Sequence, residues 1–164
     1  MIPLLARFRV PLGFVFAVVV FLLAHPTRRT LVAGVLVALA GEAVRVWAAG
    51  HLEKGREVTS SGPYRWARHP LYVGTIIMGA GLAIASASWI VAALVAVYLA
   101  TTLTSAVRTE EAFLRETFGG EYDAYCRGRT VARRFSPARA MRNREHRALL
   151  GILAGLLLLA LKTS

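Results

Sequence analysis

The sequence predicts an all-α fold, a polytopic membrane helix bundle of about five transmembrane helices with a cytosolic amphipathic connector helix. The hydrophobic fraction is 56%, above the roughly 45–50% that is usual for soluble domains. Long uncharged runs approach the ~20 residues that a helix needs to cross a bilayer. The net charge is +11, and most basic residues lie between these runs. At 164 residues, the chain is expected to form a single membrane domain over 1–164.

The predicted helices lie near residues 10–24, 31–50, 71–86, 88–107 and 148–162, and residues 108–147 form the connector. Residues 71–107 make an uncharged run of 37 residues, which is too long for one span. The Ser86-Ala87-Ser88 sequence near its middle therefore predicts a turn between two helices. The first apolar run also resembles a secretory signal, because Arg7 and Arg9 precede it. No small-x-small cleavage site follows it, so a retained helix is favoured.

The distribution of charge predicts the orientation. With five spans, the N-terminus and residues 51–70 and 108–147 share one side and carry sixteen lysines and arginines, against three on the other side. Basic residues concentrate on the cytoplasmic side of membrane proteins. We therefore expect a multi-pass integral membrane protein whose N-terminus and 108–147 loop are cytosolic. Because topology accounts for the basic charge, no nucleic-acid partner is expected.

The connector begins as an amphipathic helix. Leu114, Phe118, Tyr122 and Tyr125 recur at helical spacing and share one face. The Gly119-Gly120 pair is expected to bend or end this helix. The arginine-rich run that follows, to residue 147, is expected to be a loop facing solvent or lipid headgroups.

The sequence GPYRWARHPLYVG at residues 62–74 places polar and aromatic residues before an apolar run. Pro70 suits the first turn of a helix. Tyrosine, tryptophan and arginine there are also typical of a membrane interface. That pattern leaves the position of His69 unexplained, beside Arg68 at the expected helix start. Because a helix N-terminus attracts anions, a carboxylate or phosphate site is an equally open interpretation.

Ionisable residues mark two further positions. Glu42 and Arg45 lie three residues apart within the second predicted helix, where they can pair. Glu110 and Glu111 are adjacent acids in a basic region at the end of the fourth helix. The sequence contains no phosphate-binding or dinucleotide-binding glycine motif. No His/Cys cluster is spaced for a metal, and Cys126 is the single cysteine.

These segments resemble the isoprenylcysteine carboxyl methyltransferase family and its phospholipid N-methyltransferase relatives. Residues 62–74 fit the family pattern G-P-Y-x-x-x-R-H-P-x-Y-x-G. The second element, EEAFLRETFGGEYDAYCRGRTVARRFSP, begins at Glu110 and resembles E-E-x-x-L-x-x-x-F-G-x-E-Y-x-x-Y with a basic stretch and proline. RVWAAGHL at 45–52 is similar to the end of the family's second helix. Many relatives carry an arginine where this chain has Ala106.

The resemblance implies that S-adenosyl-L-methionine is the cofactor, bound without a dinucleotide fold between the membrane helices and the connector. It implies cofactor contacts at ten positions: Arg56, Glu57, Val58, Thr59, Tyr64, His69, Pro70, Leu71, Tyr72 and Glu110. His69 and the helix start suit the methionine carboxylate, Glu110 its ammonium, and tyrosine rings the sulfonium. No metal is expected.

The implied reaction is methyl transfer to a lipophilic small molecule or lipid within the bilayer. A carboxylate acceptor needs orientation but no base, and Arg108 or Arg45 is the candidate for that role. This favours carboxyl O-methylation as in isoprenylcysteine, whereas an amine needs deprotonation. A phospholipid amine N-methyltransferase and a non-catalytic membrane scaffold with the same fold are the alternatives. The oligomeric state is left open.

Overall fold

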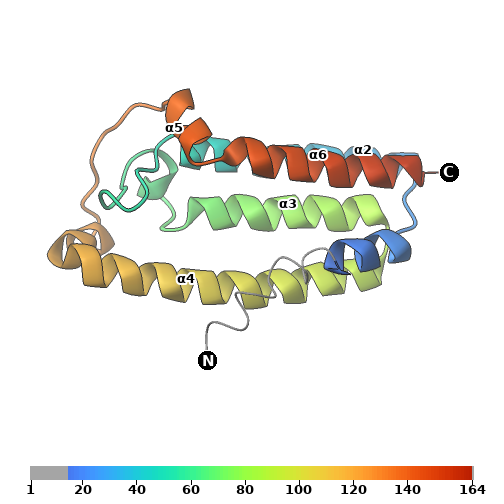
Figure 1. Ribbon diagram of the computed structural model, residues 1–164, viewed down its shortest axis with the longest axis horizontal. Coiled ribbons are helices and arrows are strands. Elements are labelled where there is room, and N and C mark those ends of the chain that lie inside the picture. Colours follow the sequence, from blue (N-terminus) through green and yellow to red (C-terminus); the bar gives the residue numbers. More distant parts are fainter. Residues whose placement is uncertain (1–14, 164) are drawn as a thin grey trace.

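The computed structural model describes residues 15–163, and over this range the chain is helical without strands. The helices lie side by side along one long axis (Figure 1). Residues 15–23 are helical and precede the following elements: α2 Arg28–Ala49, the 3₁₀ turn η1 Gly62–Arg65, α3 Pro70–Ser86, α4 Trp89–Cys126, α5 Pro137–Arg142 and α6 Glu145–Leu161.

The two ends of this bundle are built from different segments. The irregular residues 50–61, η1, α5 and the end of α4 gather at one end, on the left in Figure 1. The turn between α3 and α4 and the end of α6 lie at the opposite end. The predicted loops at 51–70 and 108–147 therefore share one end of the molecule. We call this the polar end.

Glycines bring α2 and α3 into backbone contact. Gly34 on α2 faces Gly81 on α3, and Gly41 faces Gly74. The two glycines of each helix are seven residues apart in the sequence. A Cβ on Gly34 would lie 2.5 Å from the carbonyl oxygen of Gly81, and one on Gly41 would lie 2.7 Å from that of Gly74. Small residues allow such close approach of membrane-type helices. This interface leaves no room for a side chain at these positions.

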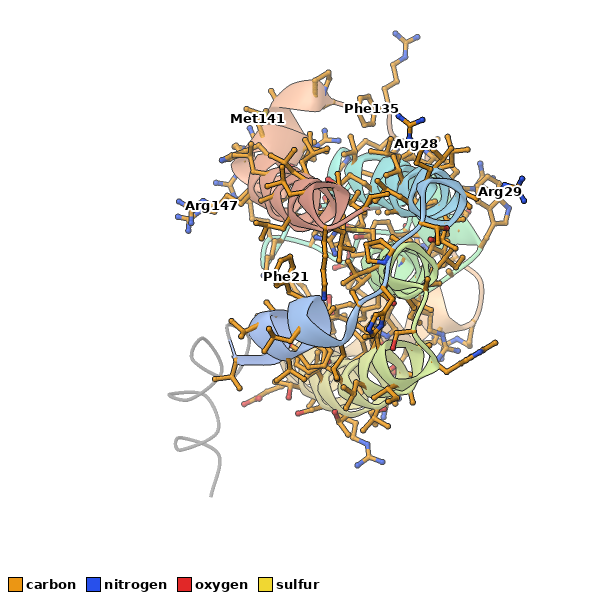
Figure 2. The ribbon with its side chains drawn as sticks, turned by 90° about the vertical axis from the view of Figure 1, so that its right-hand side faces the viewer. Phe21, Arg28, Arg29, Phe135, Met141 and Arg147 are labelled. Atoms are coloured by element: carbon orange, nitrogen blue, oxygen red, sulfur yellow. The ribbon has the colours of Figure 1, made fainter. Side chains whose placement is uncertain are left out.

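Apolar side chains join the remaining helices to this pair. Ala38 of α2, Ala85 of α3 and Leu156 and Leu159 of α6 form one cluster with Ala24. The helical residues 15–23 contact this cluster through Phe21 and also pack on α4, where the ring of Phe16 stacks on Tyr98 at 4.6 Å. Figure 2 shows that Arg28 and Arg29 point away from the bundle at the start of α2.

Three helix predictions agree closely with the structure. The helix predicted over 71–86 is α3, and Ala87 at φ 49° turns the chain so that Ser88 caps α4. The helix predicted over 31–50 is α2, which starts at Arg28 because Thr27 and Thr30 form a capping box. The last helix, predicted over 148–162, begins earlier, at Glu145. Of the first, predicted over 10–24, residues 10–14 lie outside the described residues.

The fourth helix is longer than predicted. We expected it to end at residue 107, before a separate connector helix, whereas α4 continues to Cys126. Residues 108–118 contain no glycine or proline, so the loss of hydrophobicity at Arg108 does not end the helix. The interruption falls at Gly119, with φ 42° and ψ −111°, where the sequence predicted a bend. The connector loop also contains α5, which was not predicted.

Two described helices are long and apolar enough to cross a bilayer, Arg28–Ala49 and the Trp89–Phe118 part of α4. Pro70–Ser86 is apolar but shorter. The all-helical class and membrane association are therefore supported. Among residues 15–163, two helices meet this length, so five spans remain a prediction.

Candidate functional site

His69 lies between two carboxylates at the polar end. Its Nε2 is 3.2 Å from Oε1 of Glu111, and its Nδ1 is 3.6 Å from Oε2 of Glu110. His69 occupies the N-cap position of α3, and Pro70 begins the helix. Because the two acids are consecutive residues inside α4, both can reach the imidazole. The continuation of α4 beyond residue 107 is what brings them there.

The electrostatics of this cluster favour a protonated histidine. The carboxylate of Glu110 raises the pKa of His69, burial opposes this, and Glu111 raises the pKa further. A single imidazolium then faces two carboxylates, so the cluster retains net negative charge. Such a cluster can receive one more cation.

Aromatic rings cover the cluster. The ring of Tyr72 stacks on His69 at 5.6 Å with an interplanar angle of 23°, and its side chain hydrogen-bonds Glu110. Tyr64 in η1 is buried, and its pKa is raised by burial first and by the charge of Glu110 second. The phenol therefore remains neutral close to the acidic pair.

Residues beyond the bend at Gly119 add two more tyrosines to these aromatic residues. Beyond the bend, Tyr122 is 1% exposed, and the hydroxyl of Tyr125 donates a hydrogen bond to the carbonyl oxygen of Tyr64 at 2.7 Å. Burial raises the pKa of Tyr125 to about 12. The end of α4 thus fixes η1 in place. The sequence indicated Tyr122 and Tyr125 through their shared helix face and the Y-x-x-Y pattern, without assigning them a role.

The start of α3 offers few free donors. Pro70 has no N–H, and the backbone N–H groups of Tyr72 and Val73 both donate to the carbonyl oxygen of His69, at 3.0 and 3.1 Å. Leu71 lies between Pro70 and Tyr72 in the sequence. An anion at this helix start would therefore depend more on His69 than on the helix N-terminus.

The predicted segment Arg56–Thr59 lies at the same end but divides in two. Val58 and Thr59 are buried, and Thr59 Oγ1 accepts a hydrogen bond from the backbone N–H of Glu53 at 3.1 Å. Arg56 is exposed, and Glu57 forms an ion pair with Arg133. Within residues 15–163, no hydrogen bond or ion pair joins this segment to His69 or the acidic pair.

The two arginines proposed to orient substrate have different surroundings. Arg45 is surrounded by protein: Nη1 donates to Thr75 Oγ1 at 2.5 Å and Nη2 donates to both carboxylate oxygens of Glu145. The predicted pair with Glu42 is present at 3.5 Å. Glu145 was not predicted, because no local pattern links residues 100 apart.

Arg108 is exposed, and no hydrogen bond or ion pair to it is found among the described residues. It lies two residues before Glu110, which places it about 200° around α4 from that acid, on an open face of the helix. This face also carries Ala100, Thr101, Thr104, Ser105 and Thr109. Of the two arginines, Arg108 has the free guanidinium.

The fold and this cluster define a membrane-associated helical protein with an acidic, aromatic site at one end. Residues 35–121, just over half of the chain, match the family described as phospholipid methyltransferase. The chain therefore belongs to this family. The match includes α2 from Val35 onward, η1, α3 and both acids, and it ends immediately before Tyr122.

Two curated proteins are similar to part of this chain. The nickel-cobalt-cadmium resistance protein NccN of Alcaligenes xylosoxydans xylosoxydans is 34% identical over 96 residues, covering 57% of this chain and 43% of that protein. The cobalt-zinc-cadmium resistance protein CzcN of Cupriavidus metallidurans is 35% identical over 85 residues, covering 51% of this chain and 39% of that protein. The chain spans about two fifths of the length of these relatives. No solved structure matches it.

Proposed function

We propose that this chain is an integral membrane methyltransferase that transfers a methyl group from S-adenosyl-L-methionine to a lipophilic acceptor. One observation carries the proposal: His69 is held between Glu110 and Glu111 beneath Tyr72, at the polar end of an apolar bundle. Membership of the phospholipid methyltransferase family supports it.

The residues present suit this cofactor, which carries an ammonium, a carboxylate and a sulfonium. The acidic pair exceeds the charge of His69 by one, so a carboxylate remains for the ammonium. His69 has the positive charge that a carboxylate requires. The tyrosine rings offer faces that attract a sulfonium by cation–π interaction. Residues 56–59, Pro70 and Leu71 are proposed to complete the site.

When bound, the cofactor supplies an electrophilic methyl group on sulfur. The protein has to align the acceptor with that group and exclude water. Buried Tyr64 and Tyr122 close one wall of the site. We assign orientation of an acceptor carboxylate to Arg108, because its guanidinium is free. Arg45 is the weaker candidate, because its guanidinium already donates hydrogen bonds to Glu145 and Thr75.

A phospholipid amine is the second candidate acceptor. The observation in its favour is Glu111, a second carboxylate beside His69 that the sequence interpretation left without a role. A carboxylate can accept the proton that an amine must lose before methylation. The acidic cluster would also attract a cationic headgroup.

A labelling experiment distinguishes these functions. Purified protein is incubated with lipid extract and cofactor carrying a radioactive methyl group, and the lipids are extracted. Label that mild alkali releases as methanol identifies a carboxyl ester, whereas alkali-stable label in a phospholipid headgroup identifies an amine. Absence of cofactor binding and of labelled lipid would contradict the methyltransferase proposal and favour a membrane scaffold.

For the topology, we propose five spans with the polar end in the cytosol. The charge ratio of sixteen to three and the gathering of the basic loops at one end of the bundle support this orientation. Single cysteines at Trp89 and Arg129, in a Cys126→Ser background, test it with a membrane-impermeant thiol reagent in intact cells. Only the Trp89→Cys variant should be labelled; labelling of both variants would contradict this orientation.

A further inference from the structure

A segment beyond the family match contacts the loop before η1 directly and the start of α3 through Arg45, and the proposed function assigns residues in both places to the cofactor. Residues 131–145, here called the strap, follow the end of α4 and include α5. They lie outside the matched residues 35–121. The strap runs antiparallel to residues 45–60 and contacts them along its whole length, beginning at Ser60 and ending at Arg45.

The first part of the strap holds the irregular loop before η1. The backbone N–H of Val131 donates to Ser60 Oγ at 3.0 Å. Arg133 donates to Oε2 of Glu57 at 2.6 Å. The loop contributes few bonds of its own: between Arg56 N and Glu53 O, between Glu53 N and Thr59 Oγ1, and between the ring of His51 and Ser61 Oγ. The conformation of this loop therefore depends on hydrogen bonds from the strap.

The middle of the strap caps the end of α2. Asn143 Nδ2 donates to the carbonyl oxygens of Ala49 and Leu52, both at 2.9 Å. Arg139 donates to the carbonyl oxygen of Gly50 and, through Nε, to Glu53 Oε1 at 2.8 Å. The last carbonyl groups of a helix have no partner within it, and a cation there is favourable. The strap supplies both the donors and the charge.

These contacts also affect buried His51, in the same loop. Burial first, and then the positive charges of Arg139 and Arg133, lower the pKa of His51. The neutral ring hydrogen-bonds Ser61 Oγ at 3.1 Å. The strap thus stabilises one protonation state in the segment that leads into η1.

The end of the strap reaches α3 through Arg45. Glu145 is buried and accepts two hydrogen bonds from Arg45, at 3.1 and 2.9 Å. The other terminal nitrogen of Arg45 donates to Thr75 Oγ1 at 2.5 Å and lies 3.5 Å from the carbonyl oxygen of Leu71. Leu71 is in the first turn of α3, two residues after His69. The strap therefore contacts residues 50–60 directly and the first turn of α3 through Arg45.

We infer that Asn143, Arg139 and Glu145 are positioning residues for cofactor binding, which they support by fixing residues 50–60 and the first turn of α3. This inference rests on the proposed function. None of the three belongs to the matched region, and none is assigned a direct contact with the cofactor. Loss of the strap contacts should weaken cofactor binding while leaving the α2–α3 interface intact.

The test uses the full chain in detergent and two measurements, the cofactor dissociation constant by calorimetry and backbone amide hydrogen exchange. Asn143→Leu keeps the side-chain size but removes both donors. Two lost hydrogen bonds of ordinary strength correspond to roughly tenfold weaker cofactor binding. We expect that loss together with faster exchange in residues 50–60, and unchanged exchange in the middle of α2. The KM for cofactor should rise, with kcat at saturating cofactor near that of the original chain.

Three further variants keep the test decisive. Arg147→Gln is the control, because Arg147 is exposed and points away from the bundle (Figure 2); its affinity should be unchanged. Arg139→Lys keeps the charge and should retain more affinity than Arg139→Leu. If Asn143→Leu leaves exchange in residues 50–60 unchanged, the inference is wrong. Faster exchange with unchanged cofactor affinity would instead show that residues 50–60 do not serve the cofactor, which contradicts the site in the proposed function.

Discussion

The α2–α3 interface and the polar end of the bundle are held together by different forces. At the interface, the backbones of α2 and α3 touch at glycines, so a substitution is tolerated only where there is room for a side chain. At the polar end, side chains from distant parts of the sequence hold irregular backbone through hydrogen bonds and ion pairs. The first region should respond to added volume, and the second to lost donors and charges. A change that damages binding without damaging the fold should therefore be possible only at the polar end.

The largest expected effect is steric. Gly41→Leu places a side chain where the Cβ alone would lie 2.6 Å from the backbone nitrogen of Met78. Because backbone cannot yield as a flexible side chain does, we expect a loss of more than about 3 kcal/mol of stability. Gly151→Leu is the matched control, since nothing lies within 4 Å of a Cβ there. Thermal unfolding in detergent measures both, and equal melting temperatures would contradict the close α2–α3 contact.

The next effect is on cofactor binding. Glu110→Gln keeps the shape of the side chain but removes the charge assigned to the cofactor's ammonium. Loss of a charge-assisted hydrogen bond of about 1.5–3 kcal/mol corresponds to roughly 10- to 150-fold weaker binding. Glu116→Gln, at an exposed position on the same helix, should bind normally. Unchanged affinity in a folded Glu110→Gln protein would mean that Glu110 only pairs with His69.

The smallest effect is a pH dependence of stability. The pKa of His69 is raised in the folded chain, so its protonated form stabilises the fold below the unfolded pKa of about 6.5. This contribution is lost as the pH rises through the raised folded value. The stability advantage of the original chain over His69→Gln should thus shrink as the pH rises above about 6.5, by about 1 kcal/mol or less because the acids are partly exposed. A difference that does not change with pH would indicate that His69 is neutral.

The two regions also differ in how far the sequence predicted them. The apolar runs predicted α2 and α3 well, because burial in a bilayer or a core demands the same uniform hydrophobicity. They gave the wrong end for α4, since Arg108 marks a change of surroundings and not a helix breaker. The residues of the His69 cluster were indicated by the family pattern. Glu145 and Asn143 were not, because their partners are about a hundred residues earlier and no periodicity reports such pairs.

The central claim is that His69 serves a cofactor and is not merely an aromatic residue of the membrane interface. Calorimetric titration of S-adenosyl-L-methionine into the original chain, His69→Phe and Arg65→Gln tests it most directly. Phe preserves the ring but cannot donate, whereas Arg65 is exposed at the same end and is interpreted as a topology charge. We expect His69→Phe to lose about 1–3 kcal/mol of binding free energy, with Arg65→Gln close to the original chain. Equal affinity of His69→Phe and the original chain would contradict the claim.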